Sequence, residues 1–301
     1  MGDQAEQLRE LARRIHPVTR VTPARPKSNR AMGRTIVVTS GKGGVGKTNV
    51  TVNLALALSR RKRSTILFDA DMGMANVDVL MGISPPSTIV DVIRGRRSLQ
   101  EVLVPYGDNL GIVPGGSGIP ELANLEPERL ATVIEQLHEL EQEAEFILVD
   151  TGAGIGRTVT NFVMAADEII VVTTPEPTAF TDAYGMIKEI DAHNPEARVS
   201  LLVNMVDSEQ EARAVAAKLT TVVERFLRVR VQYLSCIERD QVVVRSVLQQ
   251  RPFVSHYPGA VATRRLNLLA GALLTQGQLP PTQGGGFFQR LVERVRQVSI
   301  S

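Results

Sequence analysis

The chain has 301 residues, 43% of them hydrophobic and 22% charged, which is typical of a globular protein with one large domain or two small ones. Its net charge of +2 conceals basic ends and a mildly acidic middle, since residues 1–34 carry eight Lys or Arg against three Asp or Glu, and this argues against a nucleic-acid-binding body. A single cysteine, Cys236, excludes a disulfide framework, and no apolar stretch reaches the ~18 residues of a membrane-spanning helix.

The first 33 residues differ in character from the rest of the chain. Residues 3–15 predict a short helix because Leu8, Leu11 and Ile15 recur at helical spacing. The stretch from there to residue 33 contains three prolines and many basic residues, so we predict a flexible linker.

Short apolar runs alternate with helical stretches between Arg34 and about Leu274. The runs are continuous rather than alternating, which indicates strands buried on both faces of a parallel sheet. We therefore predict an α/β fold for a domain spanning 34–274, with a doubly wound, mostly parallel sheet of seven or eight strands flanked by helices. The predicted strands are 35–40, 64–70, 109–115, 145–152, 168–175, 199–205 and 231–237.

The stretch GKGGVGKT at 41–48 satisfies the pattern G-x-x-x-x-G-K-[ST], with a strand before it and an amphipathic helix after it. Backbone N–H groups and the helix N-terminus would bind phosphates, while Lys47 would contact the β- and γ-phosphates and Thr48 would ligate Mg²⁺. The predicted nucleotide-binding residues are Gly41, Gly43, Gly44, Val45, Gly46, Lys47, Thr48 and Asn49.

Three acids stand where predicted strands end, at the edge where parallel sheets bind ligands. Asp69 lies near the end of the predicted strand 64–70, Asp71 directly follows that strand, and Asp150 lies near the end of the predicted strand 145–152. We expect Asp71, further into its loop, to orient the attacking water, and Asp69 and Asp150 to hold Mg²⁺ with Thr48. The alternative for the first two acids is a pair of solvated loop carboxylates.

A second lysine, Lys42, lies inside the phosphate-binding loop. A flexible cation at this position can reach beyond its own site and neutralise transition-state charge in a facing protomer. The alternative is an additional local charge on the same phosphates.

Together these features resemble the MinD/ParA family of deviant-Walker ATPases. The resemblance rests on the loop with Lys42, the D-x-D at 69–71 and the DTGAGI at 150–155. The strings at 75–82, 113–125 and 174–188 resemble in particular the FlhG/FleN regulators of flagellar number. The resemblance implies a Mg²⁺-dependent ATPase that forms a homodimer in its ATP state, with Lys42 acting across the dimer.

Recognition of the base is also implied by the resemblance. It places Asn204, Ile237, Glu238 and Asp240 beside adenine. A structural role for Asn204 is the alternative. Because NMVD at 204–207 also resembles a guanine-reading motif, the residues themselves leave the choice between ATP and GTP open.

The N-terminus resembles the DQAxxLR element with which FlhG-type proteins stimulate FlhF, a signal-recognition-type GTPase. Asp3, Gln4, Leu8 and Arg9 form this predicted partner-activating element, and Gln4 would enter the partner's site. The alternative is a helix lying on this protein's own surface.

The C-terminus combines a Pro/Gly hinge at 275–286 with an amphipathic helix at 287–301. The apolar stripe and flanking arginines predict a helix that binds an anionic membrane surface, with docking on the body as the alternative. The residues expected to insert are Phe287, Phe288, Leu291, Val292 and Val295.

By this resemblance we expect an ATP-gated switch that limits flagellar number or placement. By resemblance its partners are an FlhF-type GTPase, a flagellar transcription activator and flagellar switch components. We expect a cytoplasmic protein with peripheral association at the inner face of the cell membrane. The alternatives are a MinD-like or ParA-like positioning ATPase, and a low-turnover adaptor that masks a transcription activator.

Overall fold

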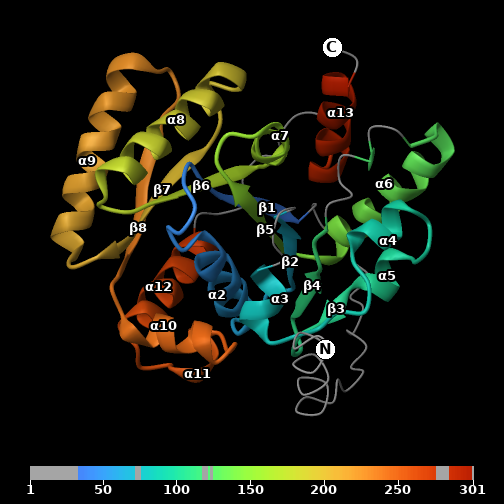
Figure 1. Ribbon diagram of the computed structural model, residues 1–301, viewed down its shortest axis with the longest axis horizontal. Coiled ribbons are helices and arrows are strands. Elements are labelled where there is room, and N and C mark those ends of the chain that lie inside the picture. Colours follow the sequence, from blue (N-terminus) through green and yellow to red (C-terminus); the bar gives the residue numbers. More distant parts are fainter. Residues whose placement is uncertain (1–32, 72–75, 117–120, 123–124, 276–284, 300–301) are drawn as a thin grey trace, which may run out of the picture.

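The computed structural model describes residues 33–71, 76–116, 121–122, 125–275 and 285–299 (Figure 1). The expected N-terminal helix, the basic linker up to residue 32 and most of the Pro/Gly hinge lie outside the described residues.

One mixed sheet forms the centre of the described part of the chain, in the order β3-β4-β2-β5-β1-β6-β7-β8. All neighbouring strands run parallel except β3 and β4. The seven predicted strands are confirmed, whereas β3 was missed because it is a two-residue edge strand that contains a proline. The strands are β1 (Arg34–Ser40), β2 (Thr65–Ala70), β3 (Val104–Pro105), β4 (Leu110–Val113), β5 (Phe146–Ala153), β6 (Glu168–Thr173), β7 (Val199–Val206) and β8 (Val231–Glu238).

Helices cover both faces of this sheet (Figure 1). One layer comprises α2 (Lys47–Ser59), α3 (Asn76–Met81), α10 (Gln241–Leu248), α11 (Phe253–His256) and α12 (Val261–Thr275). The opposite layer comprises α4 (Ile89–Ile93), α5 (Leu99–Val102), α6 (Pro127–Glu143), α7 (Arg157–Ala165), α8 (Pro177–His193), α9 (Glu209–Phe226) and α13 (Phe287–Ser299).

The continuous apolar runs are explained by this two-sided burial. In β1, Ile36 and Val38 belong to the core under α2 and α12, while Val37 belongs to the core under α6 to α9. Because successive side chains of a strand point to opposite faces, a strand covered on both faces has few positions that face water, and most of its residues are apolar.

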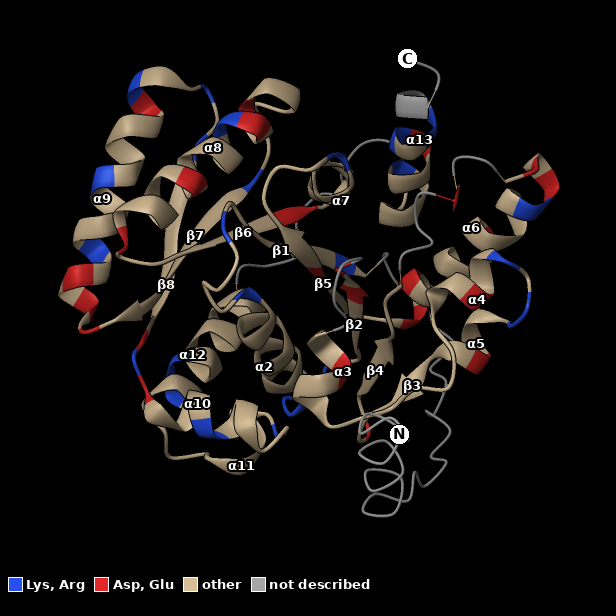
Figure 2. Ribbon diagram, in the orientation of Figure 1, with Lys and Arg blue, Asp and Glu red and all other residues tan. Residues whose placement is uncertain are grey.

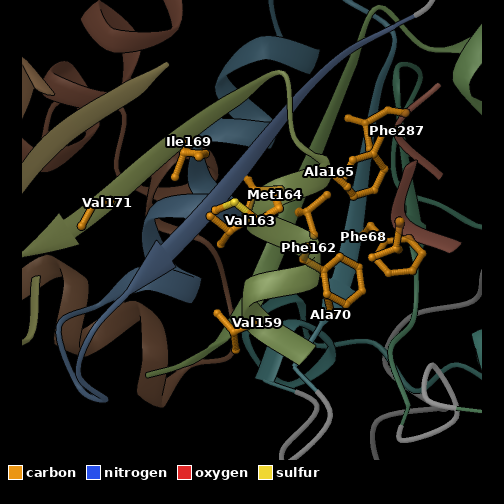
Figure 3. Packing of buried hydrophobic residues seen from close by; sticks show 14 of the residues in the cluster. Phe68, Ala70, Val159, Phe162, Val163, Met164, Ala165, Ile169, Val171 and Phe287 are labelled. Carbon is orange, nitrogen blue, oxygen red and sulfur yellow. The ribbon is translucent and has the colours of Figure 1, made fainter. Parts of the chain in front are cut away.

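The C-terminal helix α13 is docked on the body rather than presented to solvent. The five residues expected to insert into a membrane are only 1–8% exposed, and α13 packs against α7 and α6. The ring centroid of Phe287 lies 6.3 Å from that of Phe162 (Figure 3). The ring centroid of Phe288 lies 5.5 Å from that of Phe68. The structure therefore has the arrangement that the sequence offered as the alternative.

Polar contacts also hold α13 in place. The backbone N–H of Phe288 donates to Glu141 Oε1 at 2.8 Å, and Arg290 donates to the carbonyl of Ala165 at 2.9 Å and to Asp167 at 2.7 Å. In the described part of the chain, no helix combines the length and apolarity needed to cross a bilayer.

Candidate nucleotide-binding site

The loop of residues 41–48 joins β1 to α2 at the carboxyl end of the central strand. Gly44 and Gly46 have φ of +83° and +85°, in the left-handed region that favours glycine. No side chain among the described residues caps α2 at Gly46, so its first N–H groups have no side-chain capping partner there. Such a helix N-terminus at the end of a glycine-rich loop is suited to bind phosphate.

The loop is held tightly between β7 and α8. The Asn204 side-chain amide donates to the carbonyl of Val45 at 2.8 Å, and a Cβ on Gly46 would lie 2.4 Å from the same amide nitrogen. On the other side, a Cβ on Gly41 would lie 2.0 Å from the backbone oxygen of Asp182. The loop backbone is therefore pre-organised, and the structural role offered as the alternative for Asn204 is present.

Lys47 and Asp150 form a buried ion pair at the base of the loop. The Lys47 ammonium lies 2.9 Å from Asp150 Oδ1, and the two side chains are 7% and 0% exposed. The Thr51 hydroxyl donates to the same oxygen at 3.0 Å. Burial raises the pKa of Asp150, while Lys47 and hydrogen bonds from Thr48 and Thr51 oppose this rise. Lys47 and Thr48 thus both interact with Asp150, the acid that the sequence predicts as a magnesium ligand.

The donor set at this edge of the sheet fits a divalent cation. Asp150 Oδ2 is buried and has no hydrogen-bond partner among the described residues. Asp69 pairs in register with Asp150 on the neighbouring strand and is 1% exposed. Burial, and then the negative charge of Asp150, raises the pKa of Asp69 to about 8. A cation beside these carboxylates would offset both effects.

The chain by itself offers too few ligands for a closed metal site. No group of three or more His, Cys, Asp or Glu side chains suited to a metal occurs in the described residues. Mg²⁺ is commonly bound by one or two carboxylates together with substrate phosphates. Thr48, Asp69 and Asp150 would hold the ion, which would supply positive charge to the phosphoryl oxygens.

Asp71 lies directly after β2 and faces the C-terminal end of β5. Its Oδ1 would lie 3.6 Å from a Cβ on Gly152, and its backbone N–H donates to Asp69 Oδ1 at 3.0 Å. The carboxylate therefore lies beside the end of β5, which pairs with the residue that precedes the phosphate-binding loop. This position suits a group that accepts a hydrogen bond from an attacking water.

Lys42 makes its contacts with the start of α8. Its ammonium lies 3.0 Å from Glu176 Oε2 and 2.9 Å from the hydroxyl of Thr178. The Lys42 side chain is 38% exposed, and that of Glu176 is 59% exposed. An ion pair this accessible to water is weak, so Lys42 is free to exchange partners.

The residues expected beside the base are engaged in internal contacts. Ile237 is buried in the core, Glu238 Oε1 accepts from Arg265 Nε at 2.9 Å, and Asp240 caps α10 by accepting from the N–H of Val242 at 2.9 Å. Their contact with adenine stays a prediction.

Two residues of the site escaped sequence reasoning. Thr51 lies one helical turn after Lys47, so a hydroxyl at that spacing was a local signal for a second contact to the same acid. Glu176 had no such signal, since it reaches Lys42 from 134 residues away in the chain.

This arrangement defines a nucleoside triphosphate-binding domain of the P-loop class. A glycine-rich loop lies between a buried strand and a helix, its lysine meets a buried acid on the adjacent strand, and two further acids end the next strand.

Comparison with known proteins identifies the family. Residues 36–253 match the CobQ/CobB/MinD/ParA nucleotide binding domain, and the chain belongs to this family. Antiactivator FleN of Pseudomonas aeruginosa is 42% identical over 262 residues, which cover 87% of this chain and 93% of FleN. Flagellum site-determining protein YlxH of Helicobacter pylori is 34% identical over 278 residues, covering 89% and 94% of the two chains.

Solved structures agree with this assignment. MinD of Pyrococcus horikoshii, complexed with Mg-ADP, has a TM-score of 0.64 and 26% identity, and the match covers 81% of this chain and 97% of that one. A chain of the MinC:MinD cell division protein complex of Aquifex aeolicus has a TM-score of 0.65 and 25% identity, and the match covers 84% of this chain and 100% of that one. The chain is a nucleotide-binding ATPase of the MinD/ParA type.

Proposed function

We propose that this ATPase is a switch that regulates the number or placement of flagella. The observation that carries the proposal is the 42% identity to an antiactivator, FleN, along 87% of the chain, joined to a site with the geometry of a phosphate cradle. The similarity to a flagellum site-determining protein supports the same role.

The switch would be ATP-dependent homodimerisation, in which the nucleotide sites of the two copies face each other. Lys42 supports this, because the partners that hold it are exposed and easily replaced. In the dimer Lys42 would neutralise charge developing on the partner's γ-phosphate, while Asp71 orients water within its own site. Hydrolysis would then remove the contacts that hold the two copies together.

Membrane association would require α13 to leave the body. Its apolar side chains cannot reach lipid while they are buried against α6 and α7. The residues that hold α13 are close in sequence to the nucleotide site. Phe288 packs on Phe68, which directly precedes Asp69, and Phe287 packs on Phe162 of α7, the helix that follows the strand of Asp150. A nucleotide-dependent shift of these elements would weaken the docked state, and a dimer with two released helices would gain avidity for anionic lipid.

Partner regulation would use the N-terminal element and the nucleotide-dependent surface. Residues 3–9 would stimulate an FlhF-type GTPase, and the dimer would bind a flagellar transcription activator. Flagellar switch components would be further partners. The resemblance of residues 3–9 to the DQAxxLR element supports the first assignment.

Size-exclusion chromatography with magnesium and a non-hydrolysable ATP analogue tests the switch. The wild-type chain should elute as a dimer with the analogue and as a monomer without it, whereas Lys42→Ala should remain monomeric in both. Calorimetry on the same samples separates loss of dimerisation from loss of binding. If the wild-type chain binds the analogue and stays monomeric, the proposed switch is wrong.

Vesicle co-sedimentation tests the membrane step without truncating the core. Binding to anionic vesicles should rise with ATP for the wild type and for Asp71→Ala, which would hold the dimer, but not for Lys42→Ala. Equal binding by all three proteins would contradict ATP-gated association.

A further inference from the structure

A groove between α5 and α6 is not used by the proposed nucleotide cycle. It has a volume of about 240 Å³. Leu99, Leu103 and Leu140 form its apolar floor, while Glu139 and Glu143 stand on its rim. The Leu99 N–H donates to the Gln136 side chain at 2.7 Å, so the two helices that form the walls are joined by a hydrogen bond.

The α6 side of this groove is strongly acidic, whereas Arg94, Arg96 and Arg97, which precede α5, pair with Glu121, Asp91 and Glu101. Residues 126–145, which include α6, carry seven glutamates and one arginine, and Figure 2 shows acidic residues on α6. Glu139 and Glu143 have no ion-pair partner within the described part of the chain. The C-terminal end of α6 adds the negative end of its helix dipole.

The basic N-terminal segment joins the body at this same place. The N–H of Gly33 donates to the carbonyl of Glu141 at 2.9 Å, and a Cβ on Gly33 would lie 2.5 Å from the carbonyl oxygen of Ala144. Residues 9–33 carry seven Lys or Arg and one Glu. The basic segment therefore joins the body at Gly33, next to the acidic C-terminal end of α6.

The tether is long enough and its charge is complementary. From Ile15 to Gly33 the chain can span roughly 60 Å when extended, whereas the 17-residue α6 is about 25 Å long. A tether of this length gives an effective concentration on the order of millimolar, which favours the chain's own groove over that of another copy.

We propose that residues 3–15 dock as a helix in the groove between α5 and α6 of the same chain. Leu8, Leu11 and Ile15 lie on the apolar floor, and Arg13 and Arg14 meet the rim glutamates. Docking holds Gln4 on the body, so the partner-activating element is withheld until it leaves the groove. This consequence, though not the docking itself, rests on the proposed function.

Hydrogen exchange of the full-length chain, read by mass spectrometry, tests the docking. Amides of residues 5–15 should exchange on the order of ten-fold more slowly in the wild type than in Glu139→Lys/Glu143→Lys. Arg13→Glu/Arg14→Glu changes only the tail, cannot unfold the body, and should lose protection to the same degree. A variant with all four substitutions reverses the charges of both the tail and the groove rim, and it should regain protection of residues 5–15 from exchange.

Glu128→Lys/Glu135→Lys is the matched control, because both residues are exposed on α6 and neither lines the groove. It should keep wild-type protection. Equal exchange in the wild type and in Glu139→Lys/Glu143→Lys, equal loss in the control, or protection that falls on dilution would each overturn the proposal, the last by showing that a second copy is the occupant. The measurement uses no nucleotide or partner, so its failure leaves the proposed function standing.

Discussion

The role of Lys42 across a dimer can be tested by mixing two inactive variants. If Lys42 acts on the partner's nucleotide, Lys42→Ala lacks the cation and Asp71→Ala lacks the water-orienting acid. Removing a charge of the arginine-finger kind costs on the order of 10³ to 10⁵ in rate. Releasing Lys42 from Glu176 costs at most about 1 kcal/mol, since these side chains are 38% and 59% exposed. The gain in the transition state therefore far exceeds the cost of breaking the internal pair.

A phosphate-release assay at magnesium and ATP saturation gives the readout. In a 1:1 mixture a mixed dimer keeps one Lys42 and has one site with both residues, so the rate should rise above the sum of the two components, to at most about half of the wild-type rate. Glu176→Gln is the control, which should stay within about five-fold of the wild type. A mixture no more active than the sum of its components would show that Lys42 acts within its own chain.

Three further changes test the packing of the site and of α13. Glu141→Gln keeps an acceptor for the Phe288 N–H but removes a carboxylate whose pKa burial raises above 4.5. Because the pKa is raised in the folded state, the wild type loses stability as pH rises through that pKa. Denaturant unfolding should therefore show the variant to be as stable as the wild type near pH 4 and more stable at pH 8. A difference in stability that does not change with pH would contradict this. Asn204→Ala leaves the carbonyl of Val45 without its 2.8 Å donor and should lower the free energy of unfolding by ~1–3 kcal/mol, measured in urea; no change would argue against the contact. Gly46→Ala should lose ATP binding in calorimetry while retaining its circular dichroism, because a Cβ at φ +85° would meet the Asn204 amide at 2.4 Å, and wild-type affinity would refute this account of the loop.

Local patterns in the sequence were sufficient for the sheet and for the acids of the site. Seven strands were predicted because burial on both faces makes most of their positions apolar, a constraint that acts within each run. Asp69, Asp71 and Asp150 were placed together because the carboxyl ends of parallel strands share one edge. The phosphate loop was recognisable because its glycines, lysine and threonine must follow one another in the chain.

Contacts between distant segments were decided only by the tertiary structure. Asn204 holds the carbonyl of Val45 from 159 residues away, and no local pattern encodes such a bond. The fate of α13 is the clearest case, since an apolar stripe with flanking arginines fits a bilayer and a protein core equally well. In this structure the phenylalanines of α13 find Phe68 and Phe162, so the stripe is covered by the protein itself. Hydrophobic periodicity reports that a face must be buried, and only the arrangement of the other elements determines what buries it.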